Sequence, residues 1–279
     1  MRIHLFLVTC ALIIIVMSCS TDSEKEKVGE ELFPYSDQSN SGNWILNNTL
    51  SDEFDGIQID LIKWVNLYPG WNGRFPSWFV KENAIINNGE LNIIMKKEHL
   101  PEMDDEFEYS TGVIRSNNSF KYGYCEIKAK CMNSAGSSAF FLNNVQADWW
   151  TEIDVFEIGG NASGYEYIIN TNLHEFYNPD NVVMPFVFNI ETHYSDAFSP
   201  TSEWRPDAGY HIYGVEWDMS SIKWYVDGSL LRETTNSKWH QEQFINIDSE
   251  TMPDWLGLPN DNDLPSVFNV DYVRTWQKP

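Results

Sequence analysis

Short runs of hydrophobic and polar residues alternate along most of the chain, and Asn, Gly, Asp and Pro separate them. Residues 84–95 contain two such runs around the polar turn 87–90, whose Asn-Gly pair is typical of a hairpin. Residues 211–228 form a second pair of runs, and residues 266–276 alternate cleanly. Almost no segment sustains the 3.6-residue period of a helix. Many short strands at this spacing predict an all-β, antiparallel sandwich.

The segment 123–131 also alternates like a strand, and it contains Cys125 and Cys131. Six residues of strand span roughly 20 Å, which is beyond the reach of a disulfide. The two cysteines therefore cannot bridge each other within one strand, and we expect buried, inert thiols. The sequence has no CxxC pair and no His/Cys cluster, so a zinc or redox site has no support.

The N-terminal region departs from the strand pattern. Arg2 is followed by an almost wholly apolar stretch from Leu5 to Met17, which is too short to span a membrane comfortably. Ser18-Cys19 at its end resembles a bacterial lipobox, so we predict a lipoprotein signal peptide at residues 1–18 and lipidation of Cys19. A plain secretory signal and an uncleaved anchor are the alternatives.

The polar and charged residues 19–42 have little to bury and predict a flexible tether. Residues 43–279 show no internal repeat and no second boundary, and 279 residues suit one large β domain. We therefore expect a single catalytic domain on an exported bacterial lipoprotein. Its expected location is the outer membrane, at the periplasmic face or the cell surface.

Charge and aromatic content narrow the class of partner. The chain carries 18 Lys+Arg against 41 Asp+Glu, a formal net charge of -23, with the acids scattered. Such a surface repels nucleic acid and anionic headgroups, which leaves the lipid anchor as the expected membrane contact. Aromatic residues make up 15% of the chain, including 12 Trp and 13 Tyr, and flat rings suit sugar faces. We expect a monomer whose partner is a polysaccharide.

Three acids lie within six residues of the segment 150–157. The residues between them, Ile153, Val155 and Phe156, are apolar. In a regular strand Glu152 and Asp154 share one face while Glu157 points to the other. A residue bulged out between Asp154 and Glu157 would bring Glu157 onto the same face. The sequence thus predicts a bulge and a surface lined by three carboxyl groups.

Two such carboxyl groups can hydrolyse a glycosidic bond. One must stay ionised to attack the anomeric carbon, and the other must hold a proton for the leaving oxygen. A retaining enzyme needs them about 5 Å apart. We assign Glu152 as nucleophile and Glu157 as acid/base, with Asp154 between them tuning the nucleophile by a shared hydrogen bond. An exposed acidic strand or a calcium site is the alternative.

Residues 151–157, Thr-Glu-Ile-Asp-Val-Phe-Glu, resemble the bulged form of the E-[IL]-D-[IV]-x-E signature of glycoside hydrolase family 16. The resemblance extends over nearly the whole mature chain, through residues 52–56 with Trp64, 110–112, 122–129, 210–217, 224–228 and 270–274. It implies a β-jelly-roll sandwich of two antiparallel sheets, with a substrate cleft on the concave face.

Within this family, the bulged motif is typical of the laminarinase, agarase, porphyranase and carrageenase branches. The loop 71–78 resembles that of the agarases and porphyranases, which makes Trp71, Arg74 and Trp78 candidate substrate-binding residues. An arginine suits a sulfate ester, and tryptophan rings suit galactose faces. The two tryptophans could equally pack under the loop. His174 resembles a cleft histidine of the family, although a lone histidine is more often structural.

Two departures from the family pattern concern the innermost sugar platform and the substrate. Phe140-Phe141 stands where relatives commonly have Phe-Trp, so Phe141, Trp149 or Trp150 could provide the platform. No arginine lies near Asn143, where some porphyran-cleaving relatives place one, which keeps agarose open beside porphyran.

The leading hypothesis is an endo-acting, retaining hydrolase of β-linked red-algal galactan, a β-porphyranase or β-agarase that works by double displacement. A laminarinase-type β-1,3-glucanase and a non-catalytic glycan-binding surface lipoprotein are the alternatives. The catalysis calls for no cofactor. A structural calcium ion involving Asp271 is suggested by the family alone, because the sequence shows no dedicated cation loop.

Overall fold

The computed structural model describes residues 32–146, 149–177 and 193–279. One compact unit extends from Phe33 to Pro279, and Met1–Leu32 form a separate unit. The signal peptide and Cys19 lie outside the described residues, so their assignments stay predictions. Among the described residues, no helix is both long enough and apolar enough to cross a membrane.

Residues 33–42, predicted as part of the tether, belong to the compact unit. The backbone N–H of Tyr35 donates a hydrogen bond to Glu126 Oε2 at 2.9 Å. The Asp37 carboxylate accepts hydrogen bonds from the backbone N–H groups of Ser41 and Gly42 at 3.0 and 2.7 Å. These contacts hold polar residues in tight turns, and the folded unit therefore begins before the predicted boundary at residue 43.

Ten strands form the larger sheet: β1 (Ile45–Leu46), β3 (Ser77–Phe79), β4 (Ala84–Asn87), β5 (Glu90–Lys97), β6 (Tyr109–Thr111), β8 (Gly123–Lys130), β13 (His211–Trp217), β14 (Ser221–Val226), β15 (Ser229–Thr235) and β17 (Ser266–Gln277). Their order is β15-β14-β13-β8-β17-β5-β6-β3, with β1 paired to β17 and β4 to β5. The pair β3 and β6 is parallel, unlike the antiparallel pairing predicted throughout. The long connection between them, which contains the hairpin β4–β5, makes a parallel pairing possible.

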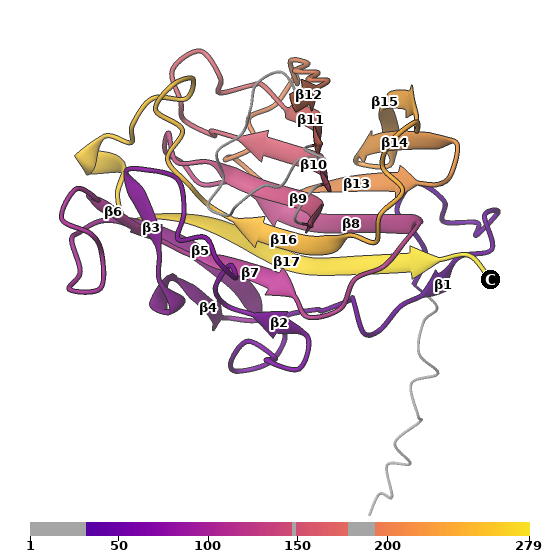
Figure 1. Ribbon diagram of the computed structural model, residues 1–279, viewed down its shortest axis with the longest axis horizontal. Helices are drawn as coiled ribbons and strands as arrows, with labels where there is room; N and C mark the ends of the chain where they lie inside the picture. The colour runs from indigo at the N-terminus through magenta and orange to yellow at the C-terminus, as the bar shows by residue number, and fades with distance from the viewer. Residues whose placement is uncertain (1–31, 147–148, 178–192) are drawn as a thin grey trace, which may run out of the picture. The chain divides into compact units, whose positions relative to one another are not determined.

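Seven strands form the second sheet: β2 (Trp64–Val65), β7 (Val113–Ser116), β9 (Ser138–Val145), β10 (Trp149–Ile158), β11 (Asn170–Tyr177), β12 (His193–Ser195) and β16 (Phe244–Asp248). Their order is β12-β11-β10-β9-β16-β7-β2. Within the described ranges, the 3-10 helices η1 (Lys81–Asn83) and η3 (Asp261–Asp263) lie in connections. Figure 1 shows the two sheets as layers, with β16 lying over β17. The predicted all-β sandwich is confirmed.

The core lies between the two sheets and is rich in aromatic rings. Phe156 of β10 packs against Tyr213 of β13 with ring centroids 4.4 Å apart, and against Phe268 of β17 at 6.0 Å. Burying a ring of this size contributes about 1.5–3 kcal/mol to stability. Because these rings come from both sheets, they fix the inner face of β10 and leave its outer face for polar side chains.

The predicted hairpins and thiols have the expected structures. Strands β4 and β5 pair around Asn88 and Gly89, whose φ angles of 56° and 76° fit a two-residue hairpin turn. Strands β13 and β14 pair as the second hairpin. Cys125, on β8, and Cys131, just after it, are free and buried. Burial raises the pKa of Cys125 to about 12, which keeps this thiol protonated and unreactive.

Candidate active site

A β-bulge shapes the central strand of the site. On β10, Asp154 pairs with Asn172 and Glu157 with Asn170, so two residues of β10 face a single residue of β11. The register with β9 also shifts between Asp154 and Phe156. The extra residue turns Phe156, which is fully buried, into the core. Glu157 consequently faces the same side as Asp154, and the bulge predicted from the sequence is confirmed.

The three acids of β10 line one cavity on the outer face of the seven-stranded sheet. The loop between β2 and β3 forms one wall, strand β9 forms the floor beside β10, and the end of β16 closes the far side. The lining residues are Tyr68, Trp71, Arg74, Ala139, Phe141, Asn143, Trp150, Glu152, Asp154, Glu157, Asp248 and Glu250. A second cavity shares four of these residues and extends along β11, past His174, Phe176 and His193. The cleft therefore continues on both sides of the acids.

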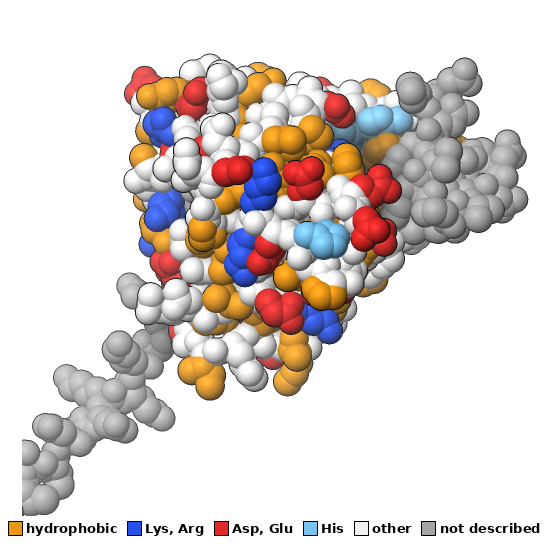
Figure 2. Space-filling model, turned by 90° about the vertical axis from the view of Figure 1, so that its left-hand side faces the viewer, with side chains coloured by type: hydrophobic (Ala, Val, Ile, Leu, Met, Phe, Trp, Pro, Cys, Tyr) orange, Lys and Arg blue, Asp and Glu red, His pale blue; other side chains and the backbone are white. Residues whose placement is uncertain are grey.

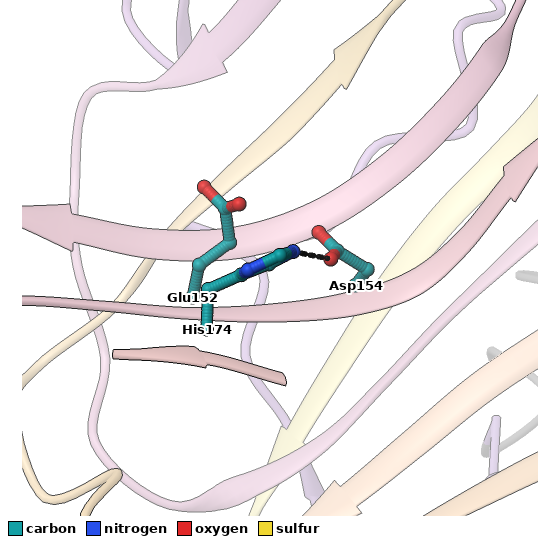
Figure 3. A group of neighbouring side chains, drawn as sticks. All are labelled: Glu152, Asp154 and His174. Carbon is teal, nitrogen blue, oxygen red and sulfur yellow. Dashed lines mark ion pairs between the residues drawn. The ribbon is translucent and has the colours of Figure 1, made fainter. Parts of the chain in front are cut away.

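Asp154 forms an ion pair with His174 across the neighbouring strand. Figure 3 shows Glu152 and Asp154 rising from β10 and the imidazole of His174 reaching them from β11. His174 Nε2 lies 3.3 Å from Asp154 Oδ2, and its Nδ1 lies 2.8 Å from His193 Nε2. Burial lowers the pKa of His174, but the hydrogen bond and charge of Asp154 outweigh it and raise the pKa to about 9. A protonated His174 places one positive charge beside the acids.

The two glutamates have raised pKa values for related reasons. Burial and the charge of Asp154 raise the pKa of Glu152 to about 7, although His174, Asn143 and Arg74 oppose the rise. Burial and Asp154 raise the pKa of Glu157 to about 8. Asn143 Nδ2 donates a hydrogen bond to Glu152 Oε2 at 3.1 Å. Glu152 is thus the more readily ionised carboxyl group, and Glu157 is the better proton donor near neutral pH.

Two residues of the loop 71–78, Trp71 and Arg74, border the cleft. Trp71 lines the first cavity and also packs edge-on against Tyr68 and Phe79, with both centroid distances at 5.3 Å. The backbone N–H of Arg74 donates to Glu250 Oε1 at 2.5 Å, and Arg74 Nε lies 3.6 Å from Glu250 Oε2. The Arg74 side chain is 52% exposed, so its guanidinium borders the cleft and remains accessible to a ligand.

Trp78 does not meet the prediction of a cleft position. It lines neither cavity described here and packs instead against Phe107, with ring centroids 4.8 Å apart. The physical reason is the two-residue period of β3, in which the neighbours Ser77 and Phe79 are buried. Trp78 therefore points to the opposite side of this strand.

Among the candidate sugar platforms, Phe141 and Trp150 reach the cleft. Phe141 lines the first cavity, and Trp150 lines both. Trp150 also packs on Phe176 at a centroid distance of 4.7 Å. Trp149 lines neither cavity, and its Nε1 donates to Glu175 Oε1 at 3.3 Å. The alternation along β10 thus separates the two adjacent tryptophans.

Sequence reasoning missed four polar residues of the first cavity: Tyr68, Asn143 as a side-chain donor, Asp248 and Glu250. The two acids follow the apolar run of β16 at a spacing of two, which is a weak signal for a shared face. Asp248 is 1% exposed, and neither of its carboxyl oxygens has a hydrogen-bond partner among the described residues. Burial and the nearby Glu250 raise its pKa well above the usual value.

Replacing Asp248 with Asn should stabilise the domain at alkaline pH. The folded-state pKa of Asp248 lies above its unfolded value of about 3.9. Its contribution to the free energy of unfolding is therefore fully present below about pH 3.9 and is lost as the pH rises. Asn carries no charge, and we expect a gain of about 1–3 kcal/mol at pH 8 that shrinks toward pH 4. Thermal unfolding at both pH values tests this, with the exposed Asp254→Asn as control. A gain that is equal at both pH values would contradict it.

A metal ion held by the acids and the histidine of the site would have to displace the ion pair between Asp154 and His174. Ligand atoms of Glu152, Asp154 and His174 lie within 4.8 Å of one another, which is close enough for one cation. A metal needs a neutral imidazole, however, and the Asp154 contact favours the protonated one. Asp271 lies on β17, and its carboxylate forms an ion pair with Lys128 at 2.6 Å. Calcium binding at Asp271 stays a prediction.

Comparisons with known proteins agree with this geometry. The family model of the GH16 domain of β-porphyranases A–D matches residues 44–278. The chain is 27% identical over 300 residues to β-porphyranase B of Zobellia galactanivorans, covering 98% of this chain and 96% of that protein. It is 30% identical over 262 residues to β-porphyranase E of the same organism, covering 84% and 88%.

A solved structure gives the same picture at the level of the fold. The crystal structure of porphyranase B from Z. galactanivorans matches with a TM-score of 0.71 and 26% identity, covering 84% of this chain and 92% of that one. Residues 44–278, which the family model matches, contain both sheets and the bulged strand β10. The chain therefore belongs to glycoside hydrolase family 16 and is a glycosyl hydrolase with a jelly-roll fold.

Proposed function

We propose that this chain is an endo-acting, retaining hydrolase of β-linked red-algal galactan, with porphyran preferred over agarose. The observation that carries the proposal is the bulged strand β10, which places Glu152, Asp154 and Glu157 in one cleft. The Glu152 carboxylate attacks the anomeric carbon while Glu157 donates its proton to the departing glycosidic oxygen. Glu157 then takes a proton from water, and this water cleaves the glycosyl ester and frees Glu152.

The electrostatics of the site support this division of roles. Glu157, with a pKa of about 8, keeps its proton near neutral pH, as a general acid must. Glu152 accepts the Asn143 hydrogen bond and lies near the positive charges of His174 and Arg74, which favour its ionised form. Asp154 raises the pKa of both glutamates and is itself held by His174.

The shape and charge of the cleft support an internal stretch of polymer as substrate. The two cavities share Trp150, Glu152 and Glu157, so sugar units can extend in both directions from the acids. Figure 2 shows one face on which acidic, basic and histidine side chains lie among hydrophobic ones. A sulfated polymer can approach such a mixed surface despite the net charge of -23.

Arg74 supports a sulfated galactan in particular. Its side chain is 52% exposed and lines the cleft, and a guanidinium can donate two parallel hydrogen bonds to a sulfate oxygen pair. Trp71 and Trp150 supply flat faces for galactose rings. Two of the similar proteins are named β-porphyranases, which supports porphyran as the substrate of this chain.

Release of reducing ends from porphyran, agarose and laminarin tests the proposal. We expect the highest kcat/KM on porphyran. Arg74→Ala should lower it roughly 10- to 100-fold there, because a charge-assisted hydrogen bond contributes about 1.5–3 kcal/mol, and should affect agarose less. The control is Arg274→Ala, because Arg274 lies on β17 of the larger sheet and its guanidinium pairs with Glu53. Activity on laminarin alone would indicate a β-1,3-glucanase, and binding without cleavage would indicate a glycan-binding protein.

A further inference from the structure

Arg115 of β7 is a buried cation whose side-chain hydrogen bonds go to neutral groups. It is 9% exposed, and none of the ion pairs among the described residues includes it. Its Nη1 donates to Asn143 Oδ1 at 2.7 Å, to Asn246 Oδ1 at 2.8 Å and to the Tyr68 hydroxyl at 3.2 Å. Its guanidinium also lies over the Phe244 ring at 4.3 Å. A buried charge is costly, so these contacts call for an explanation.

The hydrogen bonds of Arg115 determine which way the Asn143 amide faces. Asn143 Oδ1 accepts from Arg115 and, at 3.1 Å, from Asn246 Nδ2. Asn143 Nδ2 is thereby left to donate to Glu152 Oε2 at 3.1 Å and to the Tyr68 hydroxyl at 3.0 Å. The reversed amide would set its oxygen against the Glu152 carboxylate and its NH2 group against the guanidinium. Both contacts would then be repulsive.

Strand register places this network on the cleft face. Arg115 pairs with Asn246 across β7 and β16, and Asn143 pairs with Glu152 across β9 and β10. Residues directly opposite each other on adjacent strands point to the same face. Arg115 lines neither cavity, whereas Asn143 and Glu152 line the first. Arg115 therefore does not face the substrate; its hydrogen bond to Asn143 links it to Glu152, and its charge also acts on Glu152 at longer range.

We propose that Arg115 is a positioning residue, which acts through the Asn143 amide to hold the Glu152 carboxylate in its attacking orientation. The inference rests on the proposed function, because it takes Glu152 as the nucleophile. The sign of the effect follows from the hydrogen bond between Asn143 and Glu152, which favours the ionised carboxylate. Loss of Arg115 frees the amide to turn, and Glu152 then ionises at higher pH.

The pH profile of kcat/KM on the preferred galactan tests the inference. Arg115→Met should lower kcat roughly 10- to 100-fold with little change in KM, since a small misplacement of a reacting group has an effect of this size. It should also move the acidic limb of the profile to higher pH. Arg115→Lys keeps a donor for Asn143 Oδ1 and should restore the limb. A wild-type acidic limb in Arg115→Met would overturn the inference.

Asn143→Ala removes the donor directly and covers the case in which Arg115→Met does not fold. It should give the same displaced acidic limb, and the double variant should be no worse than the single ones, because both residues act through one hydrogen bond. Additive losses with an unmoved limb would mean a purely structural role. If Glu152→Gln retains activity, the proposed function fails. If Glu152→Gln is inactive but the Arg115 and Asn143 variants keep the wild-type limb, this inference alone fails.

Discussion

Replacing Glu152 with Gln should abolish hydrolysis of the polymer, with kcat lowered by roughly 10⁴-fold or more. The amide of Gln has the size of the carboxyl group but cannot form the glycosyl ester. The hydrogen bond partner Asn143 remains in place, so binding and folding should change little. Reducing-end release measures kcat, and thermal unfolding measured in parallel reports on folding. Glu175→Gln is the matched control, because Glu175 lies on the adjacent strand, pairs with Lys238 and lines neither cavity.

Azide distinguishes a nucleophile from other essential groups at this position. In Glu152→Ala, azide can occupy the space of the lost carboxylate and displace the leaving group of an activated β-glycoside directly. The product should be the α-glycosyl azide, since a single displacement inverts the anomeric carbon. Product analysis by NMR reads the configuration. A β-glycosyl azide, or full activity of Glu152→Gln, would refute the assignment of Glu152 as nucleophile.

Replacing Glu157 with Gln should slow cleavage of the natural polymer roughly 10²- to 10⁴-fold, the range for loss of a general acid. The loss should nearly vanish in the first step for a substrate with a good leaving group, such as a glycosyl fluoride, because no proton is then needed. A comparison of kcat/KM on the polymer and on the fluoride measures this difference. Equal losses on both substrates would contradict the acid role.

The pH profile and the azide product give independent tests of Glu157. Activity of the unmodified enzyme should rise as Glu152 ionises and fall as Glu157 loses its proton, so the optimum lies between about 7 and about 8. In Glu157→Gln the alkaline limb should disappear. Azide should now attack the glycosyl ester on Glu152 and give the β-glycosyl azide, and an α product would contradict the assignment.

The bulged strand could be predicted from the sequence because its determinants are local. Glu152, Asp154 and Glu157 lie within six residues, and their alternation with apolar side chains requires one extra residue to bring all three to one face. The hairpin at Asn88 and Gly89 is local in the same way, since turn chemistry sets its register. Short-range patterns of this kind are legible without knowing the partner strands.

The supporting residues of the site could not be predicted because strand pairing over long distances assembles them. Arg115, Asn143 and Asn246 are separated by 28 to 131 positions along the chain, and they meet only in the register of β7, β16 and β9. Asp248 similarly reaches the cleft only because β16 pairs with β9. A single sequence does not specify that order of strands.

The structure differs from the sequence-based prediction at two further places, and the pattern of polar and aromatic residues does not reveal the physical cause of either difference. Trp78 was placed in the cleft by the resemblance of its loop, but the burial of Ser77 and Phe79 turns it to the other side of β3. Residues 33–42 have the composition of a tether, yet backbone N–H groups bound to Asp37 and Glu126 fold them onto the domain. These hydrogen bonds hold the segment in a folded conformation that its polar composition does not predict.

Residues 33–42 also set the shortest form in which the domain can be produced. The Glu126 side chain is 1% exposed, and it accepts hydrogen bonds from the Tyr35 backbone and the Tyr272 hydroxyl. Cutting the chain at residue 43 would remove one donor and open a buried carboxylate to solvent. A protein beginning at Phe33 keeps this seal, so the sites for fusion tags and engineered linkers lie before that residue.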